Sequence, residues 1–504
     1  MTTMNQLSVG ANVEHRVRLT IGTLLAAGVV VSGLQAQHSV GGYVPETDPL
    51  VLKRLDAWQD LKFGLFMHWG LYSQWGIEAS WSLCSEDMGW NPRQKGRFQN
   101  YEHYKEDYRN LRRAFNPTEF NPARWARAAK AAGMRYVVLT TKHHDGFCMF
   151  DTETTDFKIT SAECPFHADP RANITKQTFD AFRAEGFMVG AYFSKADWNC
   201  EDYWWPYFAT PDRHVNYDPA KYPERWKRFK KFTFRQIEEL MTGVGAVDIL
   251  WLDGGWVRPI SNIPKRFEDW ARKDDWNQDI DVEKISRMAR GHQPGLIIVD
   301  RTVAGKFENY VTPEGRVPDE PIGVPWEACM TMSTGQWAFA PGQDFLPARR
   351  LIHTLVDIVS KGGNLLLNIG PSPQGEWPDT AYKRLEEIGA WMSVNGEAIY
   401  ETEFVAPFQD GKVRVTRKSA SEAVYAIYLA DEHEVRPPER IRLTTVRPKA
   451  GAVVTMLGVE GELKWETSDT GCTIEIPAPV RNKPPCEYAW TIRISSLVSA
   501  RQLK

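Results

Sequence analysis

Short apolar runs alternate with amphipathic stretches between about residue 50 and residue 402 of the chain. Strands covered by helices on both faces are apolar almost throughout, so this alternation predicts repeated β-α units around a parallel sheet. Gly133 and Gly186 follow two of the amphipathic stretches, where helices commonly end. The expected strands are 63–68, 136–140, 188–193, 248–252, 296–299 and 364–369, and the expected helices are 122–132, 178–185, 223–241 and 348–359. The pattern therefore predicts an α/β fold, a TIM-like (β/α)8 barrel.

The pattern changes near residue 404, where apolar and polar residues begin to alternate with a period of two. The clearest such segments are 412–416, 424–429, 441–444 and 488–494, with Pro, Gly and Asp between them. This alternation indicates strands with one buried face, and short strands with frequent turns favour a sandwich of two sheets. We therefore expect a small C-terminal antiparallel β-sandwich after the barrel.

The beginning of the chain has the pattern of a secretory signal peptide. Arg16 and Arg18 precede an uncharged, mostly apolar run over 19–34, and Ala36 then offers a small residue for cleavage. The run is short and rich in Gly and Ala for a membrane span, although an uncleaved anchor is the alternative. We expect a signal peptide over 1–36, a barrel over 37–402, a β-sandwich over 403–504, no membrane span and a secreted or periplasmic location.

Charge and cysteine content narrow the classes of function. The 504 residues include 61 Lys and Arg against 64 Asp and Glu and contain no long basic run, so nucleic-acid binding is not expected. The seven cysteines are scattered and odd in number, and only Cys472 and Cys486 suggest a disulfide. No CxxC, HExxH or EF-hand spacing is present, which predicts no structural metal.

Polar residues recur just after the predicted strands. They are His68, the run 142–145, Ser194, Asp253 and the pair 300–301. In a (β/α)8 barrel the carboxyl ends of all strands open on one face, so residues far apart in the sequence converge there. We therefore expect these side chains to gather around a single pocket.

Asp253 is the member of this set best placed for covalent chemistry. It follows an apolar strand and precedes Gly254 and Gly255, so a substrate can approach its carboxylate closely. Trp251 and Trp256 flank it, and aromatic walls both stack on sugar rings and exclude water. Capping of the following helix is the alternative role for a carboxylate at this position.

A retaining cleavage of a glycosidic bond would need a second carboxyl group about 5–5.5 Å from the first, protonated at rest so that it can donate to the leaving oxygen. The segments 307–314 and 325–327 supply Glu308, Glu314 and Glu327 as candidates. Residue type alone does not choose among them, and for each the alternative is a solvated loop charge.

His143 and His144 directly follow a predicted buried strand. Metal ligation is disfavoured, because neighbouring side chains on an extended chain point to opposite faces and no third ligand is suitably spaced. Hydrogen bonding to sugar hydroxyls fits better, since a neutral imidazole both donates and accepts; a structural role is the alternative. Arg301 would add a fixed fork of donors, or would instead pair with Asp300 or another carboxylate.

Seven short motifs occur in order between residues 63 and 371. They are Phe-Gly-Leu-Phe-Met-His-Trp-Gly at 63–70, Lys-His-His-Asp-Gly at 142–146, Leu-Trp-Leu-Asp-Gly at 250–254, Val-Asp-Arg at 299–301, Thr-Pro-Glu at 312–314, Pro-Trp-Glu-Ala-Cys at 325–329 and Asn-Leu-Leu-Leu-Asn-Ile-Gly-Pro at 364–371. Together they resemble the α-L-fucosidases of glycoside hydrolase family twenty-nine. The resemblance implies a (β/α)8-like barrel, a β-sandwich, double displacement and no cofactor.

The resemblance also implies roles for individual residues. By motif position Asp253 is the nucleophile and Glu314 the acid/base residue, with Glu327 in reserve. The sugar-binding residues that it implies are Phe66, His68, Trp81, His143, His144, Tyr192, Arg301 and Trp337, of which Phe66 and Trp337 would form an apolar wall for the C5 methyl group of fucose. The expected function is a secreted exo-acting hydrolase, with fucosylated oligosaccharides or polysaccharides as substrates.

One departure from the family pattern leaves the sugar open. Many members carry Glu-Trp-Tyr where this chain has Ser80, Trp81 and Ser82, so a sugar-binding Glu is replaced. Either the loss of its hydroxyl contact loosens the specificity, or Glu78 or Glu86 of the same loop supplies the contact. The alternatives are a glycosidase for α-L-galactosides or sulfated fucose, or a glycan-binding protein without catalysis. The loop 199–216, rich in Trp, Tyr, Asp and Pro, is expected to shape subsites for the aglycone.

Overall fold

A computed structural model gives the structure of residues 42–84, 100–210, 212–262, 276–469 and 471–498. The predicted signal peptide over 1–36, and the alternative of an uncleaved anchor there, lie outside these described residues. None of the helices in the described ranges combines the length and the apolar character that crossing a bilayer requires.

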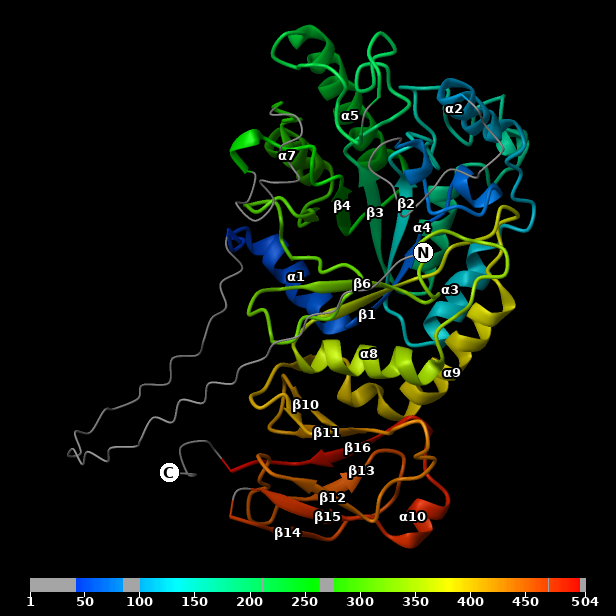
Figure 1. Ribbon diagram of the computed structural model, residues 1–504. Helices are drawn as coiled ribbons and strands as arrows, with labels where there is room; N and C mark the ends of the chain where they lie inside the picture. Colours follow the sequence, from blue (N-terminus) through cyan, green and yellow to red (C-terminus); the bar gives the residue numbers. More distant parts are fainter. Residues whose placement is uncertain (1–41, 85–99, 211, 263–275, 470, 499–504) are drawn as a thin grey trace, which may run out of the picture. The chain divides into compact units, whose positions relative to one another are not determined.

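A curled sheet of seven parallel strands, counted over the described residues, forms the centre of the fold (Figure 1). The strand order is β5-β4-β3-β2-β1-β7-β6, so β1 to β5 follow the chain and β7 and β6 continue on the other side of β1. The strands are β1 (Phe63–Met67), β2 (Tyr136–Lys142), β3 (Met188–Ser194), β4 (Ile249–Asp253), β5 (Ile297–Asp300), β6 (Glu327–Thr331) and β7 (Asn364–Asn368). Most of their residues are buried, as in a sheet covered on both faces.

Helices connect most of these strands and lie against them, α4 on β2 and β3 and α8 on β7. Local sequence sets where several helices begin: the side chains of Asn121 and Asn173 accept backbone N–H groups in the first turns of α3 and α4. The helices are α1 (Pro49–Leu61), α2 (Tyr101–Asn110), α3 (Pro122–Ala131), α4 (Ile174–Ala184), α5 (Pro223–Gly243), α7 (Val282–His292), α8 (Ala348–Ser360), α9 (Asp379–Asn395) and α10 (Ala478–Asn482).

The interior of the curled sheet is filled by side chains. Phe66, Tyr192 and Trp251 belong to one buried cluster, and Trp58 stacks on Tyr310 in the same cluster with ring centroids 4.0 Å apart. Barrel interiors of this kind are packed cores and not pores. A substrate can therefore enter only from an end of the sheet.

Residues 301–326 join β5 to β6 without a helix. Single bridges tie this segment to both edge strands, Val299 to Glu308 on one side and Glu314 to Cys329 on the other. The bridging segment thus lies beside the two edges that a complete barrel would join.

The C-terminal part contains two antiparallel sheets. One has the order β13-β16-β11-β10-β8, with β9 beside β10, and the other the order β12-β15-β14. The strands are β8 (Thr402–Glu403), β9 (Gln409–Asp410), β10 (Val413–Lys418), β11 (Val424–Leu429), β12 (Arg440–Leu443), β13 (Val454–Met456), β14 (Trp465–Thr467), β15 (Cys472–Glu475) and β16 (Ala489–Ile494).

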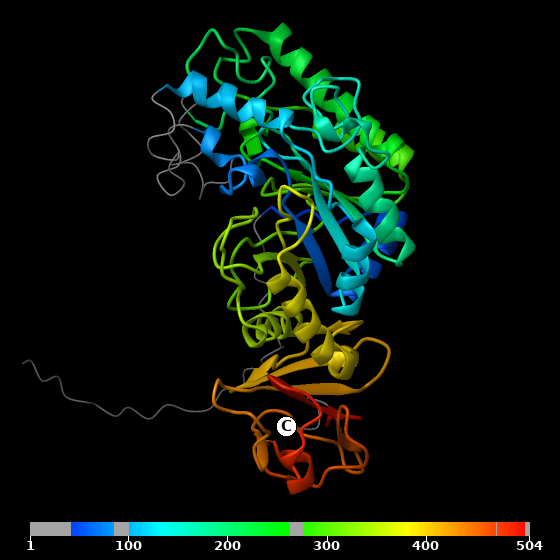
Figure 2. The ribbon, with the colours of Figure 1, turned by 90° about the vertical axis from the view of Figure 1, so that its right-hand side faces the viewer.

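The first C-terminal sheet lies against α8 and α9, as Figures 1 and 2 both show. The Trp391 indole on α9 donates to the Ala489 carbonyl at 3.0 Å, and Arg414 on β10 contacts Asp357 on α8 at 2.7 Å. Apolar residues of β11 share one buried cluster with the barrel helices. The two parts therefore have a continuous core.

The predicted fold class is confirmed: a curled, barrel-like parallel sheet with helices precedes antiparallel sheets. The six predicted strands and four predicted helices of the barrel are all present, with ends that differ by a few residues. β6 is not predicted by the apolar pattern, because its first residue is the charged Glu327.

The predicted disulfide is wrong. All seven cysteines are free thiols. Cys472 is buried on β15 in the second sheet, whereas Cys486 accepts a hydrogen bond from Asn395 on α9. The two side chains therefore have different surroundings in spite of their short separation in sequence.

Candidate active site

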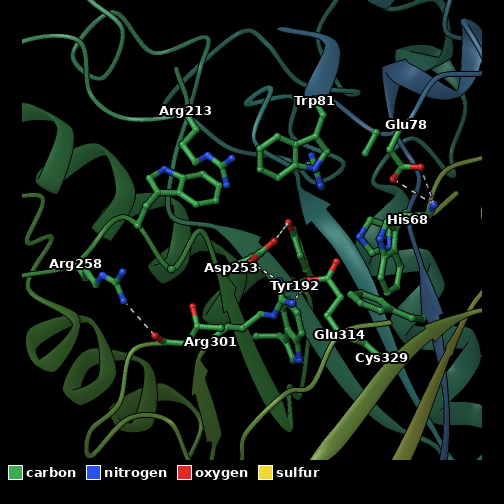
Figure 3. Close-up of a pocket in the computed structure, with 18 residues that line it drawn as sticks. His68, Glu78, Trp81, Tyr192, Arg213, Asp253, Arg258, Arg301, Glu314 and Cys329 are labelled. Atoms are coloured by element: carbon green, nitrogen blue, oxygen red, sulfur yellow. Dashed lines mark hydrogen bonds and ion pairs between the residues drawn. The ribbon is translucent and has the colours of Figure 1, made fainter. Parts of the chain in front are cut away.

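A cavity of about 220 Å³ lies where the strands of the parallel sheet end. Side chains from several strands and the following loops point into it (Figure 3). Its lining includes Phe66, His68, Glu78, Trp81, His143, Tyr192, Arg213, Trp251, Asp253, Trp256, Arg258, Arg301, Thr302, Glu314, Cys329 and Trp337. Nine of the ten site residues predicted from the sequence belong to this lining. The tenth, His144, is not part of the lining but lies next to Asp253, with its Nε2 3.7 Å from Asp253 Oδ2.

Asp253, the last residue of β4, has its carboxylate at the centre of the cavity. The Tyr192 hydroxyl donates to Oδ2 at 2.7 Å, and Arg301 Nη1 lies 3.0 Å from Oδ1. Burial alone would raise the pKa of the Asp253 carboxyl, but the Arg301 charge and the Tyr192 hydrogen bond hold it well below its usual range. Asp253 is therefore an anion within a largely enclosed site.

The two glycines after Asp253 leave room for this arrangement. Gly254 has a φ of 86°, which a residue with a side chain rarely adopts. A Cβ at Gly255 would lie 2.0 Å from Thr302 Oγ1, on the loop after β5. Larger residues here would displace either the Asp253 backbone or the loop that carries Arg301.

Glu314 lies at the mouth of the cavity, with 45% of its side chain exposed. It comes from the bridging segment, held along β6 by the Gly315 N–H to Cys329 O hydrogen bond of 3.0 Å. Its carboxylate contacts Arg301 Nη2, while Nη1 of the same guanidinium contacts Asp253. One rigid fork thus holds both carboxylates, so they face each other across a short gap.

The other two candidate glutamates do not line the cavity. Glu308 is buried and accepts the Thr302 N–H at 3.0 Å. Glu327 is fully buried at the start of β6, where Tyr136 donates to it at 2.7 Å and Trp251 at 3.3 Å. Burial raises the pKa of Glu327 to about 7. Of the three candidates, only Glu314 can reach a ligand in the cavity.

Three histidines form one side of the site. His68 Nδ1 is 2.8 Å from Asn368 Oδ1, and His144 Nδ1 is 2.7 Å from Ser194 Oγ. Burial lowers the pKa of His68 to about 4 and that of His144 to about 3, and it also lowers the pKa of His143. All three imidazoles are therefore neutral near pH 7 and can both donate and accept.

His144 has one further property suited to a ligand. Its Nε2 is buried, has no hydrogen-bond partner among the described residues and lies 3.7 Å from Asp253 Oδ2. An unsatisfied buried polar atom costs free energy. A hydroxyl group bound beside Asp253 would satisfy it.

An apolar wall stands beside the histidines. Phe66 and Trp337 line the cavity with ring centroids 6.0 Å apart, and Phe66 lies 5.4 Å from the Trp251 ring. The Trp337 backbone is held at both ends, since its carbonyl accepts from Asn368 Nδ2 at 2.7 Å and its N–H donates to Glu78 Oε2 at 3.0 Å. The wall is thus fixed to β7 and to the loop that carries Glu78.

Ser80, which replaces the family's Glu, does not line the cavity. It is fully buried, and its hydroxyl hydrogen-bonds to Nδ1 of His143. Glu78 does line the cavity, two residues earlier, and Glu86 lies outside the described residues. Burial raises the pKa of Glu78 to about 7. Trp81 lines the cavity, with its ring edge-on to that of His144 and the ring centroids 4.9 Å apart.

Some polar residues after the strands serve the scaffold instead. Lys142 pairs with the buried Asp197 at 3.2 Å, and Tyr108 donates to Asp145 at 2.6 Å. Asp300 is bound by Lys195, so Arg301 pairs with Asp253 and Glu314 and not with Asp300. Lys142, Asp145, Ser194 and Asp300 therefore lie outside the cavity lining.

Sequence reasoning misses two arginines of the cavity, Arg213 and Arg258. Arg213 belongs to the loop 199–216, whose composition points to a role at the aglycone but singles out no residue. Arg258 follows the Asp253 motif closely, and this proximity is the only signal that could have found it. No group of three His, Cys, Asp or Glu side chains within the described residues is arranged to hold a metal ion.

Comparison with known proteins gives a consistent result over most of the chain. A sequence profile described as alpha-L-fucosidase matches residues 30–397, and one described as the alpha-L-fucosidase C-terminal domain matches residues 407–495. The tissue alpha-L-fucosidase of Homo sapiens is 29% identical over 477 residues, which are 90% of this chain and 92% of that protein.

Solved structures agree. Alpha-L-fucosidase isoenzyme 1 from Paenibacillus thiaminolyticus is 29% identical, with a TM-score of 0.69 over 89% of this chain and 100% of that one. A Bacteroides thetaiotaomicron alpha-L-fucosidase, solved as a trapped covalent intermediate with 2-fluoro-fucosyl fluoride, has the same fold at 23% identity, with a TM-score of 0.67 over 90% of this chain and 98% of that one. Since the first profile alone spans well over half of its residues, the chain belongs to the α-L-fucosidase family.

Proposed function

We propose that this chain is an exo-acting, retaining α-L-fucosidase that releases terminal α-L-fucosyl groups from oligosaccharides or polysaccharides by double displacement. The observation that carries the proposal is the pair of carboxylates on the Arg301 fork, Asp253 inside the cavity and Glu314 at its mouth. Carboxyl groups of retaining glycosidases stand about 5–5.5 Å apart, whereas inverting enzymes need a wider gap for water. Two groups bound to one guanidinium match the short separation.

In the first step Asp253 attacks C1 of the fucosyl group, and the bond from C1 to the leaving oxygen breaks. Asp253 suits this role because it stays ionised and because Tyr192 and Arg301 orient its oxygens. Glu314 gives its proton to the leaving oxygen, so the aglycone departs as a neutral alcohol. The product of this step is a glycosyl ester on Asp253.

In the second step Glu314, now a carboxylate, takes a proton from water. The water oxygen attacks C1, and the bond between C1 and Asp253 breaks, which restores both carboxyl groups. The partly exposed position of Glu314 suits this step, since water reaches it from the cavity mouth. The trapped intermediate of the Bacteroides thetaiotaomicron relative supports a covalent step of this kind.

The rest of the cavity supports fucose as the bound sugar. Neutral His68, His143 and His144 can exchange hydrogen bonds with ring hydroxyls, and Phe66 and Trp337 offer an apolar surface. Fucose carries a methyl group at C5 where galactose carries CH₂OH. An apolar wall beside hydrogen-bonding groups therefore fits a deoxy sugar.

Hydrolysis of an aryl α-L-fucoside by Asp253→Ala and Glu314→Ala variants tests the proposal. Both should lose several orders of magnitude in kcat, and Asp344→Ala and Glu320→Ala, at exposed positions, should keep it. Added azide should give the β-fucosyl azide with Asp253→Ala and the α-fucosyl azide with Glu314→Ala, because the first replaces the nucleophile and the second attacks the glycosyl ester. Near-normal turnover by Asp253→Ala, or β-L-fucose as the first product of the unaltered enzyme, would refute the proposal.

We also propose that the enzyme acts outside the cytoplasm. The support is the sequence at its beginning, where Arg16 and Arg18 precede an apolar run and a small residue at Ala36. Fucosidase activity should then appear in the secreted or periplasmic fraction with a new N-terminus near residue 37. Activity confined to the cytoplasm, on an intact chain, would contradict export.

A further inference from the structure

A buried carboxyl group that the proposed mechanism does not use, that of Glu327, contacts the lining of the cavity from behind. It is 0% exposed at the start of β6, an edge strand of the parallel sheet. Its Oε2 accepts the Tyr136 hydroxyl from β2 at 2.7 Å, and its Oε1 accepts the Trp251 indole N–H from β4 at 3.3 Å. Neither strand pairs with β6 in the sheet, so both hydrogen bonds cross the interior of the barrel.

The fold makes room for these contacts. Gly64 pairs with Tyr136 on the neighbouring β1, and a Cβ at Gly64 would lie 2.4 Å from Tyr136 Cζ. The Tyr136 ring therefore occupies the space of the missing side chain. A buried polar group and its partners can often be replaced by apolar groups of the same shape at little cost in stability. Packing alone thus gives no reason for a carboxyl group at position 327.

Trp251 supports both of the groups that act on Asp253. Its ring lies 5.3 Å from that of Tyr192, at an interplanar angle of 23°, and the Arg301 guanidinium carbon is 5.2 Å from its centroid. Tyr192 donates to Oδ2 of Asp253 and Arg301 contacts Oδ1, and Figure 3 shows both side chains directed at this carboxylate. A turn of the indole would therefore disturb both contacts together.

The hydrogen bond to Glu327 selects the orientation of this indole. Trp251 is 1% exposed, and Phe66 packs edge-on against it with the ring centroids 5.4 Å apart. Packing restrains the plane of a ring, but the torsion that turns an indole has two broad minima. The N–H lies on one edge of the ring, and a hydrogen bond is directional. An acceptor at Glu327 therefore favours one of the two orientations.

We propose that Glu327 is a positioning residue for Asp253, and that it acts through the N–H of Trp251. The fixed indole holds Tyr192 and Arg301 in place, and these two side chains orient the Asp253 carboxylate. The inference rests on the proposed function, because it concerns the same reaction. Glu327 does not line the cavity, so it should affect the attack on C1 more than the binding of the sugar.

The protonation of Glu327 allows position and charge to be separated. Burial raises the pKa of Glu327 to about 7, so the group is neutral at pH 5. The other ionisable groups around it are Tyr136, Tyr310, Arg301 and Cys329, and of these only Arg301 is charged at pH 5. A neutral replacement of Glu327 therefore removes no charge at this pH, and its effect on the rate comes from lost contacts.

Two replacements of Glu327, compared on an aryl α-L-fucoside at pH 5, test the proposal. Glu327→Met removes both acceptors and should lower kcat by about tenfold to a hundredfold, since small displacements of a reacting group cost this much. KM should stay within about threefold, because the sugar contacts remain.

Glu327→Gln should keep kcat within about threefold of the unaltered enzyme. Its amide oxygen can accept from Trp251, and its NH₂ can donate to Tyr136. The Tyr136 hydroxyl can then donate to the Leu365 carbonyl, which is 3.4 Å away.

Fluoride release from 2-fluoro-fucosyl fluoride, measured in a single turnover, isolates the attack by Asp253. Fluoride is a good leaving group and needs little help from the acid Glu314. The rate of release should therefore fall in Glu327→Met by a factor similar to that for kcat. An unchanged rate of release would overturn the proposal, because Glu327 would then act on a different step.

A replacement at position 251 shows whether the effect passes through the indole N–H. β-(3-Benzothienyl)alanine in place of Trp251 keeps the shape of the ring system but has no N–H, and it should lower kcat about as much as Glu327→Met. Adding Glu327→Met to this variant should change kcat by no more than about twofold, since both changes remove the same contact. Two independent, multiplying losses would contradict the route through Trp251.

A second buried carboxyl group supplies the matched control. Glu46 is 7% exposed, binds Arg290 at 2.8 Å and does not line the cavity. Glu46→Met should lower thermal stability without lowering kcat. Thermal unfolding shows which variants are folded, and the benzothienyl variant carries the test if Glu327→Met does not fold.

The outcomes separate the two proposals. Near-normal kcat in folded Glu327→Met, or an equal loss of kcat in Glu46→Met, would overturn the positioning role and leave the fucosidase proposal intact. Absence of fucoside hydrolysis by the unaltered chain would instead refute the proposed function.

Discussion

At the scale of single residues, one guanidinium determines the ionisation of Asp253, the proposed nucleophile. Arg301 is largely buried, with 14% of its side chain exposed, and contacts Asp253 and Glu314 with separate nitrogens. Without it, burial would favour protonated Asp253, and a protonated carboxyl group cannot attack C1. The site therefore depends on this pairing at least as much as on the choice of an aspartate.

Replacing Arg301 should change both the rate and its pH dependence. In Arg301→Gln the pKa of Asp253 should rise, so the acid limb of the profile of kcat/KM should move to higher pH, and kcat/KM at its optimum should fall by about a hundredfold or more. The measurement is kcat/KM for an aryl fucoside from pH 3 to pH 9, with Arg350→Gln as the exposed control. An acid limb that stays in place would show that Asp253 does not owe its charge to Arg301.

The apolar wall should set the choice between fucose and L-galactose. A pocket of this kind rejects an added hydroxyl by only about a hundredfold. Trp337→Ala opens the wall, so the ratio of kcat/KM for aryl α-L-fucoside over aryl α-L-galactoside should drop by about tenfold. Tyr207→Ala, which removes a ring that is 76% exposed, serves as the control. An unchanged ratio in Trp337→Ala would place the discrimination elsewhere.

Some site residues can be assigned from the local sequence, whereas others require knowledge of burial or of the path of a loop. Asp253 is indicated by its place after an apolar strand, and that place is enough to bring it to the cavity. The choice between Glu314 and Glu327 requires knowing which of them is buried, and burial depends on the pairing of β6 with β7. Arg213 and Arg258 are surrounded by loop sequence, whose path is set by packing and not by periodicity.

At the scale of elements, hydrogen bonds of the Trp337 backbone tie the loop that carries Trp337 to the barrel. The Glu78 carboxyl accepts the Trp337 N–H, and Asn368 donates to the Trp337 carbonyl while its Oδ1 is bonded to His68. Movement of this loop would therefore disturb the apolar wall and His68 together.

Glu78 should make stability depend on pH. Its pKa is about 7 in the folded chain against 4.5 for an ordinary Glu, so the folded state binds the extra proton and stability falls as the pH rises from about 4.5 to about 7. Glu78→Gln keeps an acceptor for Trp337 and carries no charge. The free energy of unfolding of this variant should not show the decrease, which for the unaltered chain is roughly 3 kcal/mol at most.

Urea unfolding of the two proteins at pH 5 and pH 8 measures this difference. The free energy of unfolding of Glu78→Gln should exceed that of the unaltered chain at pH 8 by more than it does at pH 5, and Glu320→Gln should show no such change. An equal difference at both pH values would mean that Glu78 ionises in the folded chain as it does in the unfolded one.

The elements that sequence predicts well are those with an uninterrupted pattern. β2 begins with four apolar residues, β4 is apolar up to Asp253, and α5 has a long amphipathic stretch that begins at Pro223. β6 begins with Glu327, and hydrogen bonds from the Tyr136 hydroxyl and the Trp251 indole help to stabilise this carboxyl group in a buried strand. Such compensation comes from residues far apart in sequence and cannot be seen locally.

At the scale of the whole described molecule, the C-terminal sheets act as a support for the barrel. α8 and α9 bury apolar residues against β11 and β16, and Trp391 is 1% exposed at this junction. The sequence predicts two successive folds, but it does not predict this shared core. In the sequence, the residues that form this shared core cannot be distinguished from residues that are buried within the barrel or within the C-terminal part alone.

Trp391→Ala should therefore weaken both parts. The loss of a buried indole and of its hydrogen bond to Ala489 should lower the free energy of unfolding by about 3–5 kcal/mol. Loss of activity and loss of tryptophan fluorescence should coincide along a urea gradient, since the shared core makes unfolding cooperative. Ser393→Ala, exposed on the same helix, is the control, and two separate transitions would contradict the shared core.

The packed interior of the barrel closes the floor of the cavity with Phe66, Tyr192 and Trp251. A polymer cannot pass through such a site; it can only present an end. The initial rate of fucose release from a fucosylated polysaccharide should therefore follow the concentration of terminal fucosyl groups and not the mass of polymer. Shortening the polysaccharide without exposing new terminal fucosyl groups should leave the initial rate unchanged. Removing fucosylated branches should lower the rate in proportion to the terminal fucosyl groups that are lost.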